Sequence, residues 1–135
     1  MALQLSVAVR NAMLDAIETT IGTSAVLKIR TGAPPASVAT ADSGTVLATL
    51  TLPSDWMAAA SGGSKAKSGT WEDASADAAG TAAHYRIYAS DGTTAHLQGT
   101  VTATGGGGDL VVDNAVFAAG QSFSITSFSI TAPNS

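Results

Sequence analysis

The N-terminal part of the chain carries the one clear helical pattern. Apolar residues recur there every four positions with polar residues between them, namely at Val9, Met13, Ile17 and Ile21. Ser6 can cap the start of this helix and Gly22 its end. The pattern predicts a helix over residues 6–21 whose apolar stripe covers its own β sheet, with docking on a neighbouring subunit as the alternative.

Beyond Gly22 the apolar period changes from four to two, which is typical of strands. Ala25–Thr31 and Val46–Leu52 alternate or run apolar with β-branched residues, and Pro34-Pro35 marks a loop between them. We expect a short helix within residues 55–60 and a further strand at Gly69–Glu72.

Two later segments predict paired strands. Asp91-Gly92 indicates a two-residue type I′ turn, which would close a hairpin from Ala83 to Thr102. In Ser122–Thr131 the large apolar residues change parity, from odd positions to even ones. A β-bulge near Thr126–Ser127 would therefore place four apolar side chains on one face, namely Phe123, Ile125, Phe128 and Ile130.

These elements predict a mainly β fold, a β-sandwich or barrel-like antiparallel domain with one N-terminal α-helix and six to eight strands. A length of 135 residues suits one domain. We therefore divide the chain into the N-terminal helix at 1–22 and a single β domain at 23–135.

Composition points toward contact with other proteins. Ala, Thr, Ser and Gly supply 73 of the 135 residues, whereas Leu, Ile, Val and Phe supply only 27, so the core is thin for a monomer. Charged residues make up 12% of the chain and no basic run is present, which argues against nucleic acid as a partner. The chain has no Cys, no recognisable signal peptide and no apolar run near the ~20 residues of a membrane span.

The residues offer little for catalysis. The only two histidines are His84 and His96, and the predicted two-residue turn places them on opposite faces of the hairpin. A three- or five-residue loop would reverse that parity. Neither the acidic group Glu72, Asp73 and Asp77 nor the hydroxyls of Ser68-Gly69-Thr70 have a recognisable motif, and Gly105–Gly108 lacks a following Lys-Ser/Thr. We expect no catalytic residue, no cofactor and no metal site.

The aromatic residues allow two interpretations. Trp56, Trp71, Tyr85 and Tyr88 could stack on sugars, as in a carbohydrate-binding module. Each is also the largest residue of a segment that is poor in bulky groups. We therefore expect these four side chains to fill the core.

Four segments together resemble a family of small virion structural proteins of tailed bacteriophages and prophages: Asn11-Ala-Met-Leu-Asp-Ala-Ile-Glu, Leu27-Lys-Ile-Arg-Thr-Gly-Ala-Pro-Pro-Ala, Leu52-Pro-Ser-Asp-Trp-Met and His84-Tyr-Arg-Ile-Tyr. The likeness covers nearly the whole chain. It implies a component of a virion made in the bacterial cytoplasm and supplies no catalytic residues.

Within a virion, a capsid decoration or cement protein is favoured over a tail or tail-fibre component, because the chain is short and lacks fibrous repeats. We expect a homo-oligomer, first a trimer, that binds the major capsid protein or other virion proteins. The partner-facing surface is expected in the N-terminal segment and in the loops Gly32–Gly44 and Ser61–Ser68.

Overall fold

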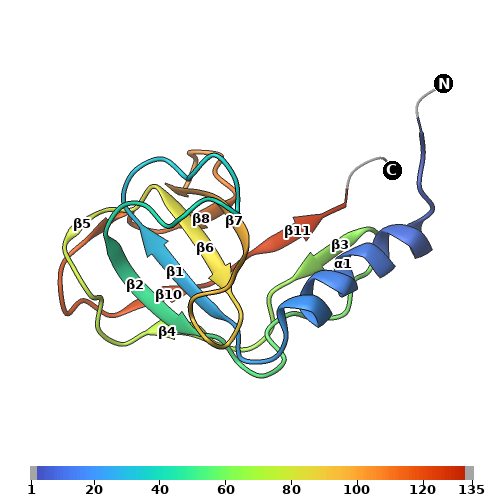
Figure 1. Cartoon of the computed structure of the whole chain (residues 1–135), viewed down its shortest axis with the longest axis horizontal. Helices are drawn as coiled ribbons and strands as arrows, with labels where there is room; N and C mark the ends of the chain where they lie inside the picture. The colour runs from blue at the N-terminus through green and yellow to red at the C-terminus, as the bar shows by residue number, and fades with distance from the viewer. Residues whose placement is uncertain (1–2, 133–135) are drawn as a thin grey trace.

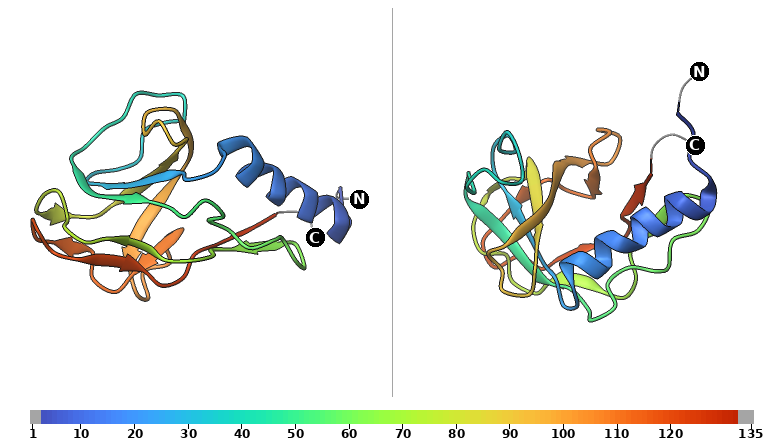
Figure 2. Two further views of the ribbon diagram at one scale, coloured as in Figure 1. Left: turned by 90° about the horizontal axis from the view of Figure 1, so that it is seen from below. Right: turned by 45° about the vertical axis from the view of Figure 1, so that its right-hand side comes forward.

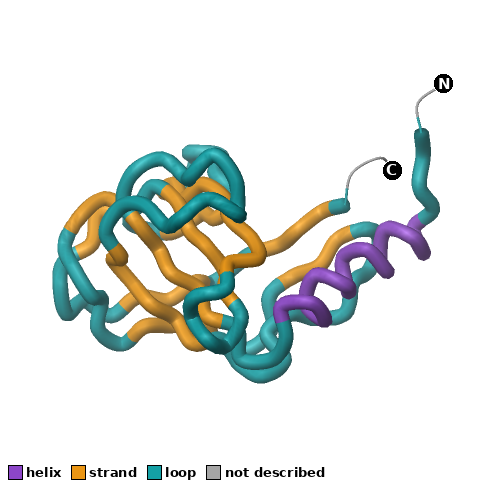
Figure 3. The backbone as a smooth tube through the Cα atoms, viewed as in Figure 1, coloured by secondary structure: helices purple, strands orange, loops and turns teal. Residues whose placement is uncertain are grey.

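The computed structural model describes residues 3–132 and is mainly β, as predicted (Figures 1 and 3). Its single described helix comes first, and eleven strands follow it. The elements are α1 Val7–Ile21, β1 Val26–Arg30, β2 Val46–Thr51, β3 Ser64–Ala66, β4 Trp71–Asp73, β5 Gly80–Thr81, β6 His84–Tyr88, β7 Ala95–Ala103, β8 Leu110–Val112, β9 Val116–Phe117, β10 Phe123–Ile125 and β11 Ser129–Thr131.

A curled five-stranded sheet forms the body of the protein, with strand order β2-β1-β6-β7-β8. Its pairs are antiparallel except β7–β8. Alternate side chains point to opposite faces, so Leu27, Ile29, Tyr85 and Ile87 pack into the core. The pairs β4–β10 and β5–β9 complete the body, whose half-barrel shape is consistent with the predicted β-sandwich or barrel-like domain.

Aromatic residues hold the middle of this core. Trp71 lies between Trp56 and Phe128, with ring centroids 6.1 Å and 5.5 Å away. Tyr85 contacts Phe128 edge-on at 5.7 Å. The indole N–H of Trp56 donates to the Gly22 carbonyl, and that of Trp71 donates to the Trp56 carbonyl. The polar N–H of each buried ring therefore has a hydrogen-bond partner. The four aromatic residues considered for sugar stacking are all buried. Trp56, Trp71 and Tyr85 belong to the core, which confirms the packing interpretation for them, whereas Tyr88 is buried outside the core cluster, where its hydroxyl donates to Asp42.

The outer face of the sheet is covered by the loop 31–45 (Figure 2). Asp42 accepts hydrogen bonds from Arg30, Arg86 and Tyr88, at 3.1, 2.8 and 2.8 Å. The Arg86 guanidinium also donates to the carbonyls of Ser37 and Thr40. The Asp42 carboxylate thus forms ion pairs with two buried arginines, Arg30 and Arg86, on the outer face.

Helix α1, β3 and β11 form an extension that projects from the body (Figures 1 and 2). The Ser6 hydroxyl accepts from the Val9 N–H and caps the helix, and Gly22 follows its end with φ of 93°. Side chains of α1 bind the segment before β3: Asn11, Asp15 and Glu18 accept the N–H groups of Gly63, Ala60 and Met57. The predicted helix and both of its caps are confirmed.

The predicted apolar stripe of α1 is only half right. The buried positions are Arg10, Leu14 and Ile21, whereas Val9 and Met13 are exposed. A four-residue repeat advances about 40° around a helix at each step, so a long stripe leaves the buried face. Arg10 takes the place of Val9 because the Ala132 carbonyl accepts two hydrogen bonds from its guanidinium.

The predicted hairpin is present as β6 and β7, but the prediction of a two-residue type I′ turn is wrong. The connection closes through the Ala89 N–H bond to the Thr94 carbonyl, and the loop contains Ser90, Asp91, Gly92 and Thr93. Gly92 has φ of 71°, whereas Asp91 has no positive φ, and a type I′ turn requires both. A register shift next to Tyr88 accommodates the longer loop.

Two other expectations need correction. Residues 122–131 form two strands rather than one bulged strand, because β10 pairs with β4 and β11 pairs with β3. Their four apolar side chains nevertheless all pack against the core, as the parity change predicted. Residues 55–60 are not helical: Met57 makes an isolated bridge to Lys67 instead.

Candidate assembly surface

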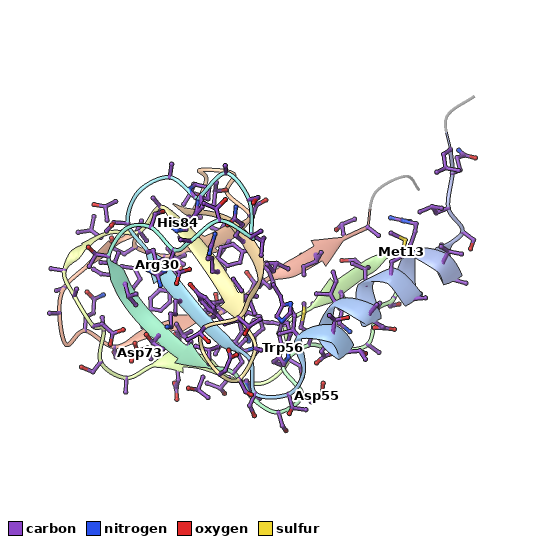
Figure 4. All side chains as sticks on the ribbon, viewed as in Figure 1. Met13, Arg30, Asp55, Trp56, Asp73 and His84 are labelled. Carbon is purple, nitrogen blue, oxygen red and sulfur yellow. The ribbon has the colours of Figure 1, made fainter. Side chains whose placement is uncertain are left out.

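An apolar stripe lies on the exposed side of α1. Val9 and Met13 are 46% and 45% exposed. Ala16 and Thr20 are also exposed and continue the stripe at helical spacing. Met13 lies on the helix of the extension, outside the body (Figure 4). Because no described element covers this row, it is a surface available to another protein chain.

A shallow groove adjoins the stripe. A cavity of about 340 Å³ lies between α1 and the start of β7, where Met13 and Ile17 face His96 and Leu97. A second cavity of about 300 Å³ continues from Leu97 along β11, and a third continues from Asp109 and Phe128 to Lys67. We call this run of cavities the β7–β11 groove.

The three segments expected to face a partner differ in their structure. The N-terminal segment was expected to face a partner, and it supplies both the stripe and one wall of the groove. The expectation for Ser61–Ser68 as a variable loop is wrong, because those residues contain β3 and the buried Lys65. The tip of Gly32–Gly44 is exposed, but Asp42 anchors that loop to the sheet.

The two histidines lie in different environments. His84 is fully buried, and its Nδ1 lies 2.7 Å from the Gly32 carbonyl oxygen. His96 is exposed near the start of β7. In the observed register His84 pairs with Thr100, and Ile87 pairs with Leu97. Within residues 3–132 no cluster of His, Cys, Asp or Glu could hold a metal ion.

The acidic residues have local structural roles. Asp73 accepts the backbone N–H groups of Thr49 and Ser75, at 2.9 and 3.0 Å. Asp77 accepts the Thr49 hydroxyl at 2.7 Å, while Glu72 is exposed. Two of the three carboxylates therefore tie the turn after β4 to strand β2.

Two backbone N–H groups of the glycine run after β7 form hydrogen bonds to the end of β7. The Gly108 N–H donates to the Thr102 hydroxyl, and the Gly106 N–H donates to the Ala103 carbonyl. A Cβ at either position would lie within 3 Å of the Thr102 side chain. These glycines allow the chain to double back so that β8 can pair with β7.

In the part of the chain that the structure describes, no helix has the length and apolar character needed to cross a membrane. The apolar stripe of α1 and the β7–β11 groove are the features of the described surface on which an assembly function can rest.

No family model, curated protein or solved structure matches this chain.

Proposed function

We propose that this chain is a non-catalytic structural protein of a tailed-phage virion, which decorates the capsid and stabilises its coat lattice. The observation that carries the proposal is the exposed apolar stripe of α1, on an extension that projects from the body. The resemblance of four segments to small virion proteins is the reason for proposing a phage particle as the place of assembly.

The stripe suits contact with protein because it is apolar, helical and uncharged. Burying Val9 and Met13 against a partner would remove their exposed apolar area from water, which favours association. Arg10 on the same helix is already bound to Ala132 within the chain. The stripe therefore presents no charge that a partner would have to neutralise.

The chemistry of the described residues supports a role without catalysis. His84 is buried against a backbone carbonyl, and His96 stands apart from it on an exposed strand end. Asp73 and Asp77 bind backbone and hydroxyl groups of Thr49. The Trp and Tyr rings that a carbohydrate-binding module would present are buried, so no observation favours that alternative.

We further propose that the protein acts as a homo-oligomer, with a trimer as the first expectation. Decoration positions on icosahedral lattices commonly lie at local or quasi three-fold axes, so a trimer would offer one surface to three coat subunits. Linking three modest contacts raises avidity without a large individual interface. This suits a stripe of only a few apolar residues.

Particles lacking this protein provide the test. They should assemble, but should release their DNA at a lower temperature than wild-type particles, and adding the purified chain should remove this difference. Antibody labelling should lie over the head. Labelling confined to the tail would contradict decoration and favour the tail or tail-fibre alternative.

A further inference from the structure

The residues before α1 form an apolar arm. Leu3–Ser6 is not helical, and its course leads away from the body (Figure 1). Leu3 is 73% exposed. Leu3 and Leu5 alternate with Gln4, so both leucines would share one face of an extended strand. The backbone groups of these three residues make no hydrogen bond to any part of the described chain.

Strand β11 has a free edge on the β7–β11 groove. The Phe128 carbonyl accepts from Lys67, and the Ala132 N–H donates to Gly63, so even-numbered residues bond to β3. In an antiparallel ladder the intervening residues point the other way. The backbone groups of Ser129 and Thr131 therefore face the groove, which both residues line.

The opposite wall of the groove has a free backbone position as well. The Val101 N–H donates to the Ala83 carbonyl, so the backbone groups of the odd-numbered residues of β7 bond to β6. The backbone N–H and carbonyl of Gln98 therefore point away from β6. Strand β8 pairs with β7 only from Val101 onward, which leaves Gln98 uncovered. Leu97 and Ile130 supply apolar lining between the two edges.

We propose that the β7–β11 groove binds the Leu3–Ser6 arm of a second copy of this chain, added as a strand to the free edge of β11. The arm has two properties that match the groove: unpaired backbone groups at residues 3–5, which can pair with the free edge, and alternating apolar side chains, which can pack on the apolar lining. Four extended residues span about 13 Å, enough to pair with a three-residue strand. Leu3 and Leu5 pack on the face that contains Leu97 and Ile130.

The occupant is a second copy because the arm of the same chain leads away from the body, whose strand β7 forms one wall of the groove. Each copy gives one arm and offers one groove, so a closed assembly of such exchanges leaves no groove empty. This inference deepens the proposed assembly function and rests on it, but it does not depend on which particle the protein joins.

Mixed cysteine crosslinking tests the exchange, because the natural chain has no Cys. Gln4→Cys and Ser129→Cys, whose side chains share the face opposite Leu3, Leu5 and Ile130, are made in separate full-length chains, one of which carries a mass tag. The chains are mixed and treated with a mild oxidant. A disulfide forms only where the two Cα atoms come within about 7 Å. We expect a covalent heterodimer that contains one chain of each kind.

The matched control places the second cysteine at Val116, which is 60% exposed and does not line the groove. Gln4→Cys should not crosslink to Val116→Cys under the same conditions. Equal crosslinking to both positions, or no heterodimer with Ser129→Cys, would overturn the exchange. Because only purified protein is used, either result leaves the location of the protein in a virion to be tested separately.

A second pair of variants tests the edge itself. Thr131→Pro removes an N–H that faces the groove and is not needed for pairing with β3, whereas Thr131→Val keeps that N–H. Measured by light scattering across a concentration series, Thr131→Pro should raise the self-dissociation constant by about tenfold or more. Thr131→Val should behave like wild type. Identical constants for the two variants would contradict strand addition.

Discussion

Arg10 in α1 donates two hydrogen bonds to the backbone carbonyl of Ala132, from Nε at 3.3 Å and Nη2 at 2.9 Å. The two residues are 122 positions apart. A Cβ on Gly63 would lie 2.3 Å from the centre of the Arg10 guanidinium, so the side chain crosses directly over this glycine. One arginine thus connects the helix, the turn before β3 and the end of β11.

Gly63→Ala should displace Arg10 and weaken the extension. The guanidinium can move aside, so the cost comes from its lost bonds to Ala132, about 1–3 kcal/mol. Gly62→Ala is the matched control, because Gly62 also has positive φ but has open space around it. Urea unfolding should show Gly63→Ala to be the less stable variant. In an Arg10→Ala background the two alanine variants should become equivalent, and a persisting difference would contradict this account.

Lys65 is buried in the extension and forms ion pairs with Asp15 at 2.7 Å and Glu18 at 3.1 Å. Burial acts to lower the pKa of Lys65. Its hydrogen bonds to the two carboxylates and their negative charges together have the larger effect, so the pKa lies above its usual value. Lys65→Met keeps the buried volume, and both carboxylates keep backbone N–H partners. We expect it to change the unfolding free energy by only about 1 kcal/mol.

Lys65→Glu should have a far larger effect, because it would place three carboxylates together. Hydrogen exchange of the backbone amides of β3 should then be fast, while those of β1 and β6 stay protected. Equal loss of protection in the body and in the extension would show that the ion-pair cluster stabilises more than the extension.

Asp42 should make stability depend on pH. Burial raises the pKa of its carboxyl, but the Tyr88 hydrogen bond and the Arg30 and Arg86 charges together lower that pKa below its usual value. A lowered folded-state pKa means that this contribution is complete above about pH 4, the unfolded value, and is lost as the pH falls further. Asp42→Asn should therefore reduce Tm at pH 7, by an amount that shrinks below pH 4.

A constant difference in Tm between wild type and Asp42→Asn from pH 7 to pH 2 would contradict this role of Asp42. Asp91 is a second source of acid sensitivity, because three hydrogen bonds from Thr93 and Thr94 lower its pKa to about 2. The comparison with Asp42→Asn removes the Asp91 contribution, which is common to both proteins.

Gly92 tests the revised turn between β6 and β7. Its φ is 71°, a conformation that β-branched residues rarely adopt. Gly92→Val should lower the unfolding free energy by about 1 kcal/mol or more, whereas Gly92→Asn should cost less because Asn tolerates this conformation. A Val variant as stable as the Asn variant would mean that the turn does not require positive φ.

The sequence patterns predicted those elements that are determined by their own residues and their immediate neighbours. The helix caps at Ser6 and Gly22, the strands β1 and β2 and the hairpin all follow from neighbouring residues. The same patterns failed where distant partners decide. Arg10, Lys65 and Arg86 are buried because carbonyl or carboxylate partners approach from elsewhere in the fold, whereas sequence patterns treat such residues as surface.

The candidate surface was predictable only in outline. The apolar residues of the N-terminal segment were apparent, but which of them stay exposed depends on how α1 rotates when Arg10 binds Ala132. The groove could not be predicted, because it depends on the break at residues 126–128. That break sends β10 to β4 and β11 to β3, and so leaves one edge of β11 free. The parity change of the apolar residues was the one sign of this break.

The most direct test of the assembly function is to add purified protein back to particles that lack it, separate heads from tails, and measure the amount bound to each. We predict saturable binding to heads at a fixed ratio to coat protein. The stripe variant Val9→Lys/Met13→Lys, checked to be folded, should not bind at the same concentrations. Binding to tails alone, no binding to heads, or equal binding by the stripe variant would contradict the account.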